Sequence, residues 1–139
     1  MPIFPASFLM VAAAAASTSS LEVDLDGMRN ARGVIQACLM RDRKSFPDCR
    51  SDPAAVKQTM PASGTRLLFT DLPPGRYALA LFHDENVNGK LDTLLGIPRE
   101  GFGFSRNPVV RFGAPRYDQV SIELVPGFTR LRVRLQYLL

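Results

Sequence analysis

Apolar and polar residues alternate with a period of two along much of the chain, which is the pattern of a β-strand with one buried face. Residues 21–25 follow this pattern, with acidic side chains on the polar face. Residues 34–40 and 76–83 are apolar on both faces, so we expect these two strands at the centre of a sheet. The pattern predicts a protein built mainly from strands.

Shorter patterns complete the expected fold. Further strands are expected at residues 56–60, at the edge of a sheet, and at 65–70, 120–124 and 131–137. Asp52 and Pro53 predict the start of a short helical turn. About seven strands with turns between them predict an all-β fold: an antiparallel, immunoglobulin-like or prealbumin-like sandwich with one long irregular loop over residues 84–117. We expect Phe102, Phe104 and Phe112 to pack this loop onto the sheet, because phenylalanines left in water promote aggregation.

The first residues predict a targeting segment. An uncharged apolar run over residues 3–16 ends in alanines, and Ala14 and Ala16 form a small-residue cleavage motif, although no Lys or Arg precedes the run. We expect a signal peptide over residues 1–19, a single β-sandwich domain over 20–139, and a periplasmic or secreted location. The run is shorter than the roughly 20 apolar residues that cross a bilayer, and we expect no transmembrane segment after cleavage. The alternative is an alanine-rich helix that belongs to the fold.

The chain has two cysteines, Cys38 and Cys49. Because disulfides persist in oxidising compartments, export predicts that the two form a bridge. The alternative is a pair of thiols, with Cys38 buried on a strand and Cys49 exposed.

Residues 84–92 have the spacing of a calcium-binding loop, with oxygen-bearing side chains at alternate positions and a glycine at the sharp turn. Leu95 stands where such a loop usually has a bidentate glutamate, so a distant carboxylate is needed to complete the site. The alternative is a turn in which Asn and Asp side chains bond their own backbone without Ca²⁺. The expected Ca²⁺ ligands are Asp84, Asn86, Asn88, the Lys90 carbonyl, Asp92 and Glu100.

The formal net charge of +4 permits contact with anionic partners. Arg130, Arg132 and Arg134 occupy one face of the last expected strand, because alternate side chains of a strand share a face. This face is a candidate surface for an anionic polysaccharide or an envelope protein, and the alternative is an ordinary solvated sheet face. Nucleic acid is not an expected partner of an exported protein.

Three motifs carry a resemblance to known families. Residues 69–77 read F-T-D-L-P-P-G-R-Y, which resembles a turn of prealbumin-like (transthyretin-like) sandwiches. Residues 83–92 read H-D-E-N-V-N-G-K-L-D and residues 96–105 read G-I-P-R-E-G-F-G-F-S. Together with the first strand and the Gly27-x-Arg29 turn, they resemble a family of exported bacterial proteins classed as a domain of unknown function. The resemblance implies export and a sandwich fold, and it implies no established reaction.

His83, Asp84 and Glu100 raise the hypothesis of a small hydrolase-like envelope enzyme, with a general base, an orienting acid and a second carboxylate. No nucleophile elbow, second histidine or phosphate-binding glycine loop accompanies them. The sequence therefore favours a non-enzymatic exported sandwich that acts as a calcium-braced binding or interaction module. The enzyme and an arginine-mediated binder of anionic envelope polymers are the alternatives.

Overall fold

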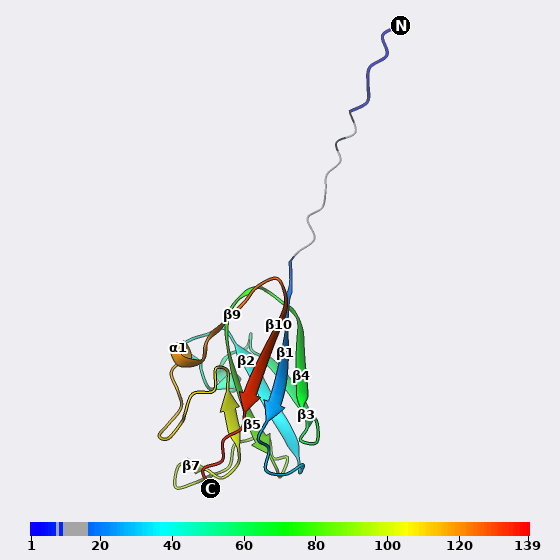
Figure 1. Ribbon diagram of the computed structural model, residues 1–139. Coiled ribbons are helices and arrows are strands. Elements are labelled where there is room, and N and C mark those ends of the chain that lie inside the picture. Colours follow the sequence, from blue (N-terminus) through cyan, green and yellow to red (C-terminus); the bar gives the residue numbers. More distant parts are fainter. Residues whose placement is uncertain (8, 10–16) are drawn as a thin grey trace.

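The computed structural model describes residues 1–7, 9 and 17–139 of the chain (Figure 1). The cleavage motif at Ala14 and Ala16 lies outside the described residues, so the signal peptide stays a prediction. None of the helices in the described ranges is both long enough and apolar enough to span a bilayer.

A three-stranded sheet has the strand order β10–β1–β4. Its strands are β1 (Ser19–Asp26), β4 (Arg66–Leu72) and β10 (Gly127–Arg134), and Figure 1 shows β10 beside β1. β1 runs antiparallel to β4 but parallel to β10, which departs from the fully antiparallel arrangement that we expected. The parallel pair arises because β10 follows a strand of the other sheet, so a crossing between sheets sets its direction.

The second sheet has the order β3–β2–β5–β8, and β9 pairs with the first residues of β5. The two apolar segments form its centre and residues 56–61 form an edge, so these sequence predictions are confirmed. A small separate hairpin pairs β6 (Thr93–Leu94) with β7 (Ile97–Pro98). The strands of the second sheet are β2 (Val34–Met40), β3 (Val56–Pro61), β5 (Gly75–Asp84), β8 (Phe102–Phe104) and β9 (Ile122–Leu124).

The main core lies between the two sheets, as the all-β sandwich prediction requires. Alternate residues of β1 and β4, such as Val23 and Phe69, face alternate residues of β2 and β5, such as Ile35 and Leu79. All four of these side chains have 0% exposure. Burial of such side chains contributes about 1.5–3 kcal/mol each to folding, which makes this core the main source of stability.

A second apolar cluster covers the other face of the β2–β5–β8 sheet, and it explains why β5 is apolar on both faces. Ala78 of β5 packs there with Phe102 and Phe104 of β8 and with the helix α1 (Tyr117–Val120). Phe46 packs edge-on against Phe104, with 6.0 Å between ring centroids. The predicted Cys38–Cys49 disulfide is confirmed, and it ties the segment that carries Phe46 to β2.

Residues 84–117 are more regular than we expected, because they contain β6, β7 and β8. β8 escaped prediction because it is three residues long and has glycine at its centre, a residue that weakens strands. Gly103 is needed there, since a Cβ at this position would lie 2.8 Å from the Cγ1 atom of Val133.

The turn expected at Asp52 forms, but it is not a helix. The Asp52 side chain accepts a hydrogen bond from the Ala54 N–H, and its carbonyl oxygen accepts one from the Ala55 N–H. A 3₁₀ helix that the sequence did not indicate precedes it at Cys49–Ser51 and is capped by Asp48. The expectation that Phe112 packs onto the sheet was wrong: it is 96% exposed, whereas Val110 packs against the second cluster.

Candidate functional site

The loop 84–92 begins at Asp84, the last residue of β5, whose side chain is fully buried. Its Oδ1 atom accepts a hydrogen bond from the Asn88 N–H at 3.1 Å, and its Oδ2 atom accepts one from the Gly89 N–H at 2.8 Å. Gly89 has φ +77°, a conformation that glycine adopts without steric penalty. The Asp84 carboxylate therefore folds the tip of the loop back onto the end of the strand.

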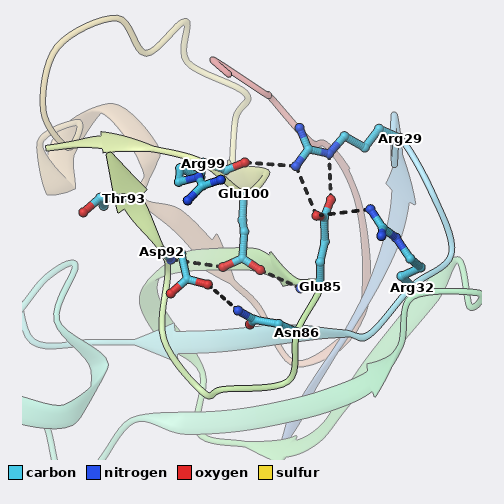
Figure 2. A pocket seen from close by; sticks show the side chains of 8 residues that line it. All are labelled: Arg29, Arg32, Glu85, Asn86, Asp92, Thr93, Arg99 and Glu100. Atoms are coloured by element: carbon cyan, nitrogen blue, oxygen red, sulfur yellow. Dashed lines mark hydrogen bonds and ion pairs between the residues drawn. The ribbon is translucent and has the colours of Figure 1, made fainter. Parts of the chain in front are cut away.

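Glu100 closes the same loop from the opposite side (Figure 2). Its Oε2 atom accepts from the Glu85 N–H at 2.6 Å and its Oε1 atom from the Asp92 N–H at 3.0 Å. Glu100 is only 4% exposed. A buried carboxylate is tolerated when each oxygen accepts a hydrogen bond, and such charge-assisted bonds are among the stronger ones in proteins. Glu100 thus joins the first and last turns of the loop.

Asp92 organises the interior of the loop. Its carboxylate accepts hydrogen bonds from the side-chain amides of Asn86 at 2.7 Å and Asn88 at 2.8 Å, and these bonds hold the pKa of Asp92 below its ordinary value. The Oδ1 atom of Asn88 accepts from the Lys90 N–H at 3.1 Å, which is an Asx turn. These contacts match the metal-free alternative raised by the sequence.

The fit of this loop to Ca²⁺ can be judged from its donors. The carboxylates of Asp84, Asp92 and Glu100 already accept two or more hydrogen bonds each. Across the described ranges, no three side chains among His, Cys, Asp and Glu converge to hold a metal ion. The arrangement does not fit a cation without rotation of the two asparagine amides, so Ca²⁺ stays a prediction of the sequence and no step is derived through it.

His83 is fully buried at the end of β5, and both ring nitrogens have partners. Nε2 lies 2.6 Å from the Arg32 carbonyl oxygen, so it carries the hydrogen and donates it. Nδ1 lies 2.9 Å from the hydroxyl of Tyr137, and in the neutral imidazole it accepts a hydrogen bond from that hydroxyl. His83 therefore connects β5 to the segments that precede β2 and follow β10, in the manner of a structural histidine.

An ion pair that sequence reasoning missed stands beside this histidine. The guanidinium of Arg29 donates to both oxygens of Glu85, at 2.6 Å and 3.1 Å, and lies 4.7 Å from the centre of the Tyr137 ring. It also donates to the carbonyl oxygens of Arg99 and Leu139. The pair lowers the pKa of Glu85 and raises that of Arg29. The available signal was the Gly27-x-Arg29 turn, which marked Arg29 only as a motif residue.

These groups line a polar cavity of about 530 Å³ (Figure 2). Three arginines face three carboxylates across it, so the cavity has no large excess of either charge. Two of the arginines, Arg29 and Arg32, form ion pairs with Glu85. Arg32 is the more accessible of the two, with 75% side-chain exposure and a distance of 3.9 Å to Glu85. The lining residues are Arg29, Arg32, Glu85, Asn86, Asp92, Thr93, Arg99 and Glu100.

The candidate arginine surface on β10 faces acidic neighbours on β1. β1 places Glu22, Asp24 and Asp26 directly opposite the three arginines in the parallel register. Glu22 binds Arg130 at 3.0 Å, and Asp26 lies 3.9 Å from Arg134. Strands at opposite ends of the chain form this pair, so the partial neutralisation was not visible in the sequence. An anionic polymer there would compete with three carboxylates. The arginines are Arg130, Arg132 and Arg134.

A larger, apolar groove of about 1060 Å³ opens over the outer face of the β2–β5–β8 sheet. Its floor includes Ala80, Phe82 and Phe102, and the Cys38–Cys49 bridge lines it as well. The loop 84–92, which Asp84 and Glu100 brace and which we call the braced loop, lines it with residues 89–91. The β6–β7 hairpin lines it with residues 93 and 95–98, and the segment before α1 with residues 110–114. Sequence reasoning missed this groove, although leucine and isoleucine recur between residues 91 and 97.

We predict that Glu100→Gln lowers the free energy of unfolding by about 2–3 kcal/mol. A glutamine can accept from one of the two N–H groups, but its own amide hydrogens then face the other donor. Urea denaturation measures the change. The control is Glu123→Gln, at an exposed position of β9, and the account fails if the two variants unfold alike.

We predict a pH dependence from the Glu85–Arg29 pair. The pKa of Glu85 in the folded protein lies below its ordinary value of 4.5, so the pair stabilises the fold above that pH. This stabilisation is lost as the pH falls through the folded-state pKa. Between about pH 7 and pH 3, wild type should lose stability more steeply than Glu85→Gln. Parallel curves in urea denaturation would contradict this.

We predict that the melting temperature is the same in EDTA and in about 5 mM CaCl₂, which is within the affinity range of extracellular calcium sites. The reason is that hydrogen bonds already satisfy the loop carboxylates. Asp92→Ala serves as the control. A calcium-dependent rise that disappears in this variant would establish the metal site that the sequence suggests.

Comparison with known proteins identifies the family. No curated protein and no solved structure matches the chain. A bacterial family described as "Uncharacterized protein conserved in bacteria (DUF2141)" matches residues 23–131, which begin within β1, end within β10 and include the loop 84–92 and most of the groove lining. The match agrees with the resemblance noted on the motifs at residues 83–92 and 96–105. The chain therefore belongs to the DUF2141 family.

Proposed function

We propose that the protein is a non-enzymatic, exported binding module that holds an apolar ligand in the groove over the β2–β5–β8 sheet. The observation that carries the proposal is the groove itself: about 1060 Å³, lined mainly by apolar side chains and bordered by the motif loop. Ligand sites in proteins are commonly concave, largely apolar and of about this size.

The side chains at the groove support a binding role. Leu95 and Phe112 line it although each is 96% exposed. Ile97 of the same hairpin also lines the groove and is 43% exposed. Large apolar side chains gathered at one concave surface are typical of interaction sites, because isolated exposure in water gives them no favourable contacts.

The motif loop supports the same role through preorganisation. Asp84 and Glu100 fix residues 85–92 by hydrogen bonds to the backbone, and Gly89, Lys90 and Leu91 of that segment line the groove. A wall that is already ordered loses less conformational entropy when a ligand binds. We propose that this is why the motif combines carboxylates, asparagines and glycine.

The burial and hydrogen bonds of the residues considered as catalytic groups argue against an enzyme. His83, Asp84 and Glu100 are at most 4% exposed, and their polar atoms bond to backbone groups, Tyr137 and Gln36. A general base needs access to a substrate proton, which these contacts do not provide. The Cys38–Cys49 disulfide supports export, because such bridges persist in oxidising compartments.

We predict that the mature chain binds the neutral dye Nile red at one saturable site in the groove. Phe112→Asp and Leu95→Asp should each weaken binding about tenfold, because a charge replaces apolar contact area. Both positions are exposed, so the fold is preserved. Dye fluorescence, titrated against protein, gives the affinity.

The matched controls are Phe128→Asp and Val125→Asp, which replace side chains that are 59% and 58% exposed outside the groove. These variants should bind the dye as wild type does. Equal weakening in all four variants, or no saturable binding by wild type, would overturn the proposed function.

A further inference from the structure

We propose that the groove accepts a single acyl chain whose head group is anionic, taken up as a lipid monomer. The inference rests on the proposed function and adds the chemical class of the ligand. Three features of the groove support it. The backbone groups of its floor already have hydrogen-bond partners, cations lie at its border, and the hairpin beside it has an unfavourable turn conformation.

The floor offers apolar contact without hydrogen-bonding groups. Ala80 and Phe82 are paired with Phe104 and Phe102 in the β5–β8 ladder and with β2 on the other side, so their backbone groups are already used. A peptide laid on this floor would leave its own N–H and C=O groups without partners, which is unfavourable. An acyl chain has no such groups, so the floor favours it.

The charged residues at the groove favour an anionic head group. Lys57, Lys90 and Arg111 line it, and none has an ion-pair partner among the residues that the structure describes. The one acidic lining residue, Asp48, lies 3.6 Å from Arg50, which also lines the groove. Three cations are therefore left to attract a phosphate or carboxylate.

The hairpin contains a local conflict between sequence and conformation. Leu95 and Gly96 form its two-residue turn with φ +53° and +79°. Turns with both values positive favour Asn-Gly, and leucine is disfavoured at the first position because of its Cβ atom. Leu95 is therefore both exposed to solvent and in an unfavourable backbone conformation. Such residues are found preferentially at binding sites. Contact with an acyl chain would bury it.

We predict that the mature chain binds palmitoyl lysophosphatidylglycerol threefold to tenfold more tightly than palmitoyl lysophosphatidylcholine, a difference expected for one or two exposed ion pairs. The two probes share one chain and differ in net charge. Isothermal titration calorimetry is run below the critical micelle concentration of each. The triple variant Lys57→Gln/Lys90→Gln/Arg111→Gln should remove the preference, and Lys44→Gln/Arg116→Gln, outside the groove, should retain it.

The outcomes separate this inference from the proposed function. Equal binding of the two lipids leaves an apolar ligand site and overturns the anionic head group. Binding of Nile red without either lipid overturns the acyl chain and leaves the proposed function standing. If the protein floats with phosphatidylglycerol vesicles but binds no lipid monomer, the exposed apolar side chains at the groove contact a membrane surface. This outcome overturns monomer uptake. A dimer in sedimentation that excludes lipid assigns the groove to a second copy, which also overturns it.

Discussion

The carboxylate of Glu100 holds the loop 84–92 in one conformation. It accepts the N–H groups of Glu85 and Asp92, which lie at the two ends of a loop that has no strand or helix of its own. Without such an acceptor, these two partly buried donors would lack protein partners, at a cost of up to about 1–3 kcal/mol each. Asp84 does the same for the tip of the loop, and between them the two carboxylates convert a polar segment into a fixed wall.

The fixed wall matters because β5 is apolar on both faces. One face fills the sandwich core, and the other carries Ala78, Ala80 and Phe82 toward a second layer. That layer is incomplete: α1 and Phe46 cover part of it, and the rest is the floor of the groove. The braced loop leads directly into the β6–β7 hairpin, whose exposed leucines lie at this opening. Loop order and groove shape are thus consequences of the same hydrogen bonds.

Much of the fold could be predicted because its signals are local. Alternation and apolar runs identified β1 to β5, and the L-P-P-G-x-Y motif at residues 72–77 identified the turn in which the Tyr77 hydroxyl donates to the Pro73 carbonyl. The last strand was expected at residues 131–137 and spans Gly127–Arg134. The bridge between Cys38 and Cys49 followed from compartment and count. Features that depend on partners distant in sequence could not be predicted. The parallel β1–β10 pair and the carboxylates opposite Arg130 and Arg134 are of this kind.

The candidate site was likewise predictable only in its local part. The spacing of residues in the sequence identified Asp84, Asn88 and Gly89 as loop residues, and Glu100 was expected to reach the loop from a distance. The spacing could not show what the carboxylates bind, because backbone N–H groups and cations satisfy the same oxygen atoms. The ion pair between Arg29 and Glu85 and the apolar groove depend on tertiary packing, and no periodicity reports them.

Amide hydrogen exchange, measured by nuclear magnetic resonance on residues 20–139 without added metal, tests the central claim most directly. The account predicts that the amides of Glu85 and Asp92 exchange slowly, because each donates to a carboxylate that is only 4% exposed. The amide of Lys90, whose acceptor is the exposed Asn88 side chain, should exchange much faster. Exchange of Glu85 and Asp92 as fast as that of Lys90 would contradict the claim that Glu100 braces the loop.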